Sequence, residues 1–254
     1  MAPLRIAHVS DFHFRRWTRF HERLQDRLAA LDFDLLAMTG DFSAHPRDWR
    51  WVARLIRRFV RPFRPPLGCY AVPGNHDAVI LSQQFGADAV RFLRNESVRI
   101  EPNGHVIHLA GTDDSWRSVA DLPKTLAGCR DGHPTILLSH VPSTIHHLPD
   151  DIVDLVLSGH THAGQWRIPW FGSVTVNDRI SRAQTHGLHR IGRRWLHVTA
   201  GVGTSGPFNF RLNCPPEVAL LTLRTHRGAP AANASTCQIT VPRRAHHSRE
   251  GGCG

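Results

Sequence analysis

The sequence lacks any apolar run that approaches the roughly 20 residues needed to span a bilayer. Its amino terminus passes at once into a strand-like segment at Leu4, which leaves no room for the charged and apolar regions of a secretory signal. These two absences predict a cytoplasmic location. Peripheral contact with a membrane surface is compatible with both.

Cysteine is scarce and irregularly placed. The chain has five cysteines, an odd number, and none forms a C-x-x-C pair. This pattern argues against a disulfide framework and against a cysteine-ligated structural zinc site. The sequence also has no G-x-S-x-G segment of the kind that presents a nucleophilic serine. A covalent mechanism therefore has no candidate residue.

Lysine is almost absent, because Lys124 is the single lysine among 31 basic residues. The formal net charge is +10, so the chain attracts anionic partners by long-range steering. A small anionic substrate and a nucleic acid both fit this charge. The bias toward arginine looks genome-wide, so the charge does not by itself identify the partner.

Length and composition fit one folded domain with a tail. The chain has 254 residues, of which 41% are hydrophobic and 20% are charged, as in an ordinary globular protein. Regular patterns continue to about residue 225. We therefore predict a domain over residues 1–225 and a disordered tail of alanine, proline, serine, arginine, histidine and glycine over residues 226–254.

Short apolar runs alternate with helical patterns through the first part of the chain. The predicted strands cover residues 4–9, 34–38, 69–72, 135–138 and 154–158. The predicted helices cover residues 19–31, 48–63 and 81–93. Several short strand-like runs follow residue 166, and we expect this second half to be more antiparallel.

Each of the five predicted strands ends in polar residues that can bind a metal. One such residue is usually only a turn residue or an isolated histidine. In open α/β architectures, however, the carboxyl ends of strands converge on one crevice, so five such ends in succession predict a common site. The residues are Asp11, His13, Asp41, Asn75, His76, His140, His160 and His162.

The chemistry of this set favours a pair of metal ions. Carboxylate oxygens and neutral imidazoles suit Mn²⁺, Fe or Zn²⁺. This set offers too many ligand groups for one tetrahedral ion. They suit two divalent ions about 3.5–4 Å apart, as in two-metal phosphoryl-transfer sites.

The series of motifs resembles the signature of the calcineurin-like metallophosphoesterase superfamily. The segment Gly159–Gln165, with the GHTHxGQ pattern, is similar to a bacterial phosphodiesterase branch of that family, except that Ala163 replaces a more usual glycine. This resemblance implies an α+β fold with a single domain, a four-layer α/β/β/α sandwich of two mixed β-sheets.

The resemblance also implies a role for each residue. Asp11, His13 and His162 would hold the first metal; Asn75, His140 and His160 would hold the second; Asp41 would bridge the two. His76 would donate a proton to the leaving group, with Asp77 orienting it, while a hydroxide between the metals attacks phosphorus. The implied activity is that of a metal-dependent phosphoric ester hydrolase, a phosphodiesterase or a phosphomonoesterase.

Other functions stay open at this level. The arginine-rich helix predicted at 48–63 is compatible with a nuclease on the same scaffold, and Arg15, Arg16 and Trp17 could grip a phosphate or an acyl chain. A binding scaffold without catalysis would be expected to lack some of the ligands, and this chain lacks none of them. The sequence shows no sign of an obligate protein partner.

Overall fold

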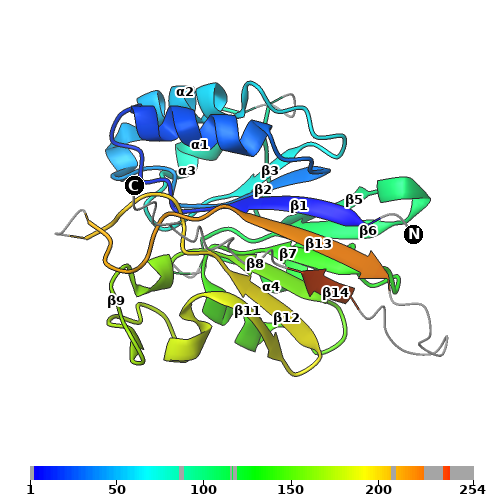
Figure 1. Cartoon of the computed structure of the whole chain (residues 1–254). Coiled ribbons are helices and arrows are strands. Elements are labelled where there is room, and N and C mark those ends of the chain that lie inside the picture. Colours follow the sequence, from blue (N-terminus) through cyan, green and yellow to red (C-terminus); the bar gives the residue numbers. More distant parts are fainter. Residues whose placement is uncertain are drawn as a thin grey trace, which may run out of the picture.

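The computed structural model describes residues 3–85, 89–114, 116, 119–206, 210–225 and 237–240. Two β-sheets lie face to face, and helices cover their outer faces (Figure 1). The predicted α+β single domain with two mixed sheets is confirmed.

The first sheet has the strand order β14-β13-β1-β2-β3-β4. Strands β1 to β4 run parallel, whereas β13 is antiparallel to both β1 and β14. The strands are β1 (Leu4–Val9), β2 (Leu35–Thr39), β3 (Cys69–Val72), β4 (Arg91–Phe92), β13 (Ala219–Thr225) and β14 (Cys237–Thr240).

The second sheet has the order β11-β12-β8-β7-β6-β5. Its four central strands are parallel, and β5 and β11 are antiparallel edges. The expectation of a more antiparallel second half holds for β11, which pairs antiparallel with β12, whereas β12 departs from it by also pairing in parallel with β8. The strands are β5 (Glu96–Ile100), β6 (Ile107–Gly111), β7 (Thr135–Leu138), β8 (Leu155–Ser158), β11 (Gly187–Ile191) and β12 (Arg194–Val198).

Three apolar layers hold these sheets together. One layer lies between the first sheet and the helices α1 (Arg19–Ala29) and α2 (Trp49–Val60), where Phe59 is fully buried. A second layer lies between the sheets and contains Ile6 and Leu157. The third covers the outer face of the second sheet under α4 (Leu122–Thr125) and the 3-10 helix Pro142–His147. The burial of apolar area in these layers is the main favourable term for the fold.

The predicted helix over 81–93 is wrong. Helix α3 covers only Val79–Ser82, and Arg91–Phe92 form β4 instead, paired with Tyr70 and Ala71 of β3. A two-residue strand carries almost no local signal. Its place is determined by the free edge of β3, which it covers.

The structure describes part of the predicted tail. Cys237–Thr240 form β14, which pairs with β13 and extends the first sheet. These four residues therefore depart from the prediction of disorder. The other residues beyond 225 lie outside the described part of the chain.

Among the described residues, no helix has both the length and the apolar character that a transmembrane span requires. The short β9 (Arg167–Ile168) and β10 (Gly172–Ser173) form a separate hairpin, which lies on the side of the molecule where the parallel strands end (Figure 1).

Candidate metal centre

The carboxyl ends of five parallel strands bring the predicted ligands to one edge of the sandwich. Strands β1, β2 and β3 of the first sheet lead to Asp11, His13, Asp41 and Asn75. Strands β7 and β8 of the second sheet lead to His140, His160 and His162. The two sheets therefore contribute to the site from opposite sides, and all seven of these residues meet there.

One half of the site joins the first and last motifs of the domain. The Nε2 atoms of His13 and His162 lie 3.0 Å apart. His162 Nε2 also lies 3.4 Å from Asp11 Oδ1. Together the three residues offer one ligand atom each within 4.8 Å of one another, and all three are buried. These three residues form a candidate site for one cation.

The other half gathers an amide and two imidazoles. His140 Nε2 lies 3.1 Å from Asn75 Oδ1 and 3.3 Å from His160 Nδ1. His140 Nδ1 faces the backbone carbonyl of Thr39 at 2.7 Å. That carbonyl oxygen accepts a hydrogen bond from the Nδ1–H of the ring, so Nε2 faces the site as the ligand atom.

Asp41 lies between the two halves. Its Oδ2 atom is 3.4 Å from His13 Nε2 and also 3.4 Å from His140 Nε2. Its Oδ1 atom accepts a hydrogen bond of 2.8 Å from the backbone N–H of His76. One carboxylate thus faces both groups of imidazoles.

The donor set fits divalent cations. Two imidazole nitrogens at 3.0 Å need either a shared proton or a common cation between them, and burial disfavours the protonated form of both rings. Buried imidazoles and carboxylates that face one another, without a cysteine, suit borderline first-row metals.

Backbone strain concentrates in this site. Five of the seven predicted ligands have a positive φ, the left-handed conformation that side chains other than glycine rarely adopt: Asp11 (55°), His13 (42°), Asp41 (52°), His160 (67°) and His162 (51°). Each such residue costs on the order of 1 kcal/mol. Strain of this kind persists where the surroundings hold it for function.

Burial and neighbouring charges shift the pKa values of the ligands. Burial opposes a charge on His140, but Asp41 and Asp11 raise its pKa to about 10. Burial raises the pKa of Asp11 to about 7 and lowers those of His13 and His160 to about 4. Burial alone would raise the pKa of Asp41, yet His140 and His13 hold it well below its usual value. The site thus combines three neutral imidazoles with a charged His140 and the charged carboxylate of Asp41.

His76 lies beside this centre. Its ring meets the ring of His13 edge-on, with 4.9 Å between centroids, and its Nδ1 lies 3.4 Å from the carbonyl oxygen of Ala44. The groups that face a potential cation also include His76 with His13 and Asp41. The geometry alone therefore leaves His76 available for either ligation or proton transfer.

Asp77 does not have the predicted contact with the imidazole of His76. Its carboxylate instead accepts backbone hydrogen bonds from Phe42 (3.3 Å), Ser43 (2.9 Å) and Gly74 (3.0 Å). Burial raises its pKa to about 6. Asp77 thus joins the loops after β2 and β3, and it positions Asp41 and His76 through the backbone.

Sequence reasoning missed Arg211, whose guanidinium lies behind His162. Arg211 Nη2 is 3.3 Å from His162 Nδ1 and donates to the carbonyl oxygens of Ala200 (2.8 Å) and Gly203. The sequence signal that could have identified it is its isolation, since Arg211 is the single arginine, lysine, aspartate or glutamate between Arg194 and Glu217.

A cavity of about 450 Å³ opens onto the centre. Trp116 and Asn177 line it beside the ligands, and neither was singled out from the sequence. The Trp116 ring lies 4.9 Å from the His160 ring, and Asn177 O faces His160 Nε2 at 3.1 Å. The cavity thus lies directly beside the predicted ligands.

Two stacked mixed sheets with histidine and aspartate loops at one edge form an arrangement that can hold metal ions. A family model described as calcineurin-like phosphoesterase matches residues 4–164, so the chain belongs to that family. The chain is therefore a metal-dependent phosphoric ester hydrolase, as the resemblance implied.

Relatives agree with this assignment, and a solved structure shares the fold. The chain is 28% identical to phosphodiesterase YaeI of Escherichia coli, covering 87% of this chain and 83% of the relative. It is 26% identical to UDP-2,3-diacylglucosamine pyrophosphatase LpxG of Chlamydia muridarum, over 86% and 83% of the two chains. The fold is similar to that of the NAD nucleotidase NadN from Haemophilus influenzae, with a TM-score of 0.55 and 11% identity, over 95% of this chain and 49% of the other.

Proposed function

We propose that the protein is a phosphodiesterase with two metal ions. Asp11, His13 and His162 hold one ion; Asn75, His140 and His160 hold the other; Asp41 contacts both. The observation that carries this proposal is the position of Asp41, whose Oδ2 atom lies 3.4 Å from an imidazole of each half. A carboxylate in that position is the bridge that a two-metal site needs.

When bound, such a metal pair lowers the pKa of a water molecule and neutralises charge on a phosphoryl group. The side chains of this protein do the rest. The net charge of +10 steers an anionic ester to the cavity. His76 lines that cavity, and a proton on its Nδ1 has an acceptor in the Ala44 carbonyl. In its protonated form His76 supplies a proton to the leaving oxygen.

A phosphodiester is the substrate class that the similarity to YaeI favours. A phosphoanhydride is a second candidate, favoured by the similarity to LpxG, which is named as a pyrophosphatase. Mn²⁺ is the metal with which we expect activity, followed by Fe and Zn²⁺.

The test uses the full chain, stripped of metal with a chelator and reloaded with Mn²⁺. Two Mn²⁺ per chain and hydrolysis of bis(p-nitrophenyl) phosphate faster than of p-nitrophenyl phosphate are expected. A nucleoside diphosphate derivative tests the phosphoanhydride, and single-stranded DNA and RNA test the nuclease. A protein that binds two ions and hydrolyses none of these would contradict the proposal.

A further inference from the structure

The hairpin formed by β9 and β10 carries an apolar tip that contributes little to the core of the protein. Trp170 is 103% exposed, Phe171 is 57% exposed and Ile168 is 50% exposed, and Pro169 completes the tip. Large apolar side chains that are exposed together are typical of a surface that binds a protein, a membrane or a ligand. We call residues 168–171 the apolar tip.

The backbone of the tip is held in an unfavourable conformation. Trp170 has φ = 63°, in the left-handed region that favours glycine. A bulky residue in this region is an outlier, and such outliers cluster at functional sites. Because the Trp170 side chain is fully exposed, its presence there is not explained by burial in the core.

The base of the hairpin is firmly attached, so the tip projects from a fixed support. Ser173 is buried, and its hydroxyl donates to Ala163 O at 2.8 Å. On the other strand, Arg167 N donates to Leu212 O at 2.9 Å. Leu212 is itself 48% exposed and extends the apolar surface beside the tip.

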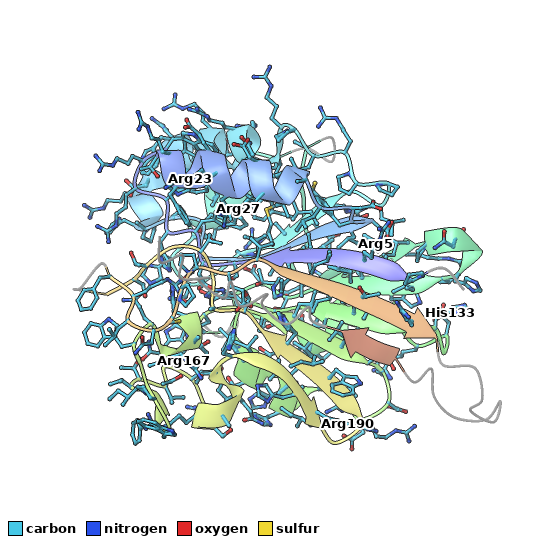
Figure 2. The ribbon with its side chains drawn as sticks, viewed as in Figure 1. Arg5, Arg23, Arg27, His133, Arg167 and Arg190 are labelled. Atoms are coloured by element: carbon cyan, nitrogen blue, oxygen red, sulfur yellow. The ribbon has the colours of Figure 1, made fainter. Side chains whose placement is uncertain are left out.

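One arginine contacts the tip, and two more lie close to it in the sequence. The Arg182 guanidinium lies 4.2 Å from the centre of the Phe171 ring, and Arg179 and Arg182 are both exposed. Arg167 lies at the base of the hairpin, on the side of the molecule where the parallel strands end (Figure 2). Between residues 165 and 185 Asp178 is the single acidic residue, so this surface carries a net positive charge.

The segment that carries the tip begins and ends in the catalytic cavity. His162 and Asn177 both line that cavity, and the hairpin is the chain between them. A surface that contacts the tip is therefore close to the metal centre as well.

We propose that the apolar tip docks the protein on the surface of a bilayer that contains anionic phospholipid. Tryptophan and phenylalanine enter the boundary between headgroups and acyl chains, and the arginines contact lipid phosphates. A second protein fits less well, because a stable protein interface buries about 800 Å² on each partner, far more than a tip of four residues offers. Two copies of this chain, each with a charge of +10, also repel each other.

The experiment measures cosedimentation of the full chain with vesicles of phosphatidylcholine, with and without phosphatidylglycerol. Binding is expected only with phosphatidylglycerol and is expected to weaken as salt is added. Trp170→Ser and Phe171→Ser should each weaken binding at least about tenfold. Trp170→Phe should keep most of the binding. Equal binding by wild type and both serine variants would overturn the proposal, as would absence of wild-type binding.

Leu31→Ser is the matched control. Leu31 is 39% exposed and lies just before the start of β2, at the end of the sheet away from the metal site, so its loss should leave binding unchanged. Brominated phospholipid should quench wild-type tryptophan fluorescence, and it should quench Trp170→Phe less although that variant still binds. A wild-type dimer in sedimentation velocity that Trp170→Ser dissociates would overturn the proposal and assign the tip to contact between copies.

This proposal and the proposed hydrolysis can fail separately. Trp170 is not among the proposed ligands or the groups that line the catalytic cavity. Trp170→Ser should therefore hydrolyse a soluble chromogenic diester at the wild-type rate. If the wild-type protein does not hydrolyse the diester but binds vesicles, and Trp170→Ser weakens that binding, the catalytic proposal is wrong and the docking proposal stands.

Discussion

The Nε2 atoms of His13 and His162 lie 3.0 Å apart, although 149 positions separate the two residues in the chain. His13 follows a strand of the first sheet, and His162 follows a strand of the second. A cation held between these nitrogens would therefore link the two sheets, and its binding would stabilise the whole domain.

Metal should accordingly raise the melting temperature. At a free metal concentration about 100 times the dissociation constant, the free energy of unfolding rises by about 2.7 kcal/mol. For a chain of this size that corresponds to roughly 5–10 °C. Scanning calorimetry with and without Mn²⁺ measures the shift. His162→Ala should abolish it, whereas His147→Ala, at an exposed histidine outside the site, should not. The same shift in all three proteins would place the metal elsewhere.

His76 and Asp41 should respond differently to substitution. Under the proposed roles, His76→Ala removes a proton donor and should lower kcat by about 10²–10⁴ while the metal content stays near two per chain. Asp41→Ala removes a carboxylate that faces both halves of the site, so it should lose metal as well as activity. Elemental analysis beside kinetics separates the two effects. Equal metal loss in both variants would make His76 a ligand.

The positions of the proposed ligands were predictable because each follows a strand that the sequence itself reveals. Buried runs such as Leu35–Thr39 and Leu155–Ser158 are short and largely apolar. Each is followed directly by a glycine and then by polar residues. Once those strands are parallel, their carboxyl ends must converge. The convergence of Asp11 and Asp41 follows from this rule, whereas the approach of His162 from the other sheet depends on how the two sheets pack.

The remaining errors have a tertiary cause. Arg91–Phe92 form a strand only because β3 offers an unpaired edge, which no local pattern shows. The family resemblance assigned Asp77 to orient His76. Its actual partners include the N–H groups of Phe42 and Ser43, whose approach depends on how two loops pack. Arg211 reaches His162 by the same kind of contact.

Asp77 should accordingly matter for stability and site assembly. Asp77→Ala leaves the N–H groups of Phe42, Ser43 and Gly74 without their acceptor. We expect a loss of about 1–3 kcal/mol in the free energy of unfolding and weaker metal binding. Urea unfolding and metal titration measure the two effects. The control is Asp26→Ala, at an exposed aspartate of α1. An Asp77→Ala protein as stable as this control would show that the three hydrogen bonds to Asp77 do not stabilise the fold.

A second pair of histidines lies buried between the sheets, away from the proposed ligands. His8 on β1 and His197 on β12 face each other through their Nδ1 atoms at 3.0 Å, and His8 Nε2 lies 2.9 Å from Thr39 Oγ1. Burial lowers the pKa of His197 to about 4 and that of His8 well below its usual value. The folded protein therefore keeps both rings neutral in mildly acidic solution.

Stability should consequently fall as the pH drops below about 6.5, the ordinary pKa of histidine. Between that pH and about 4 the unfolded chain binds a proton at position 197 and the folded chain does not, so acid favours unfolding. The full effect of this one group is about 3 kcal/mol. Urea unfolding of the metal-free protein at a series of pH values measures it. In His197→Gln the free energy of unfolding should fall less steeply with decreasing pH, since glutamine does not titrate. The exposed His147→Ala should leave this pH dependence unchanged. An unaltered slope in His197→Gln would assign the acid sensitivity to other groups.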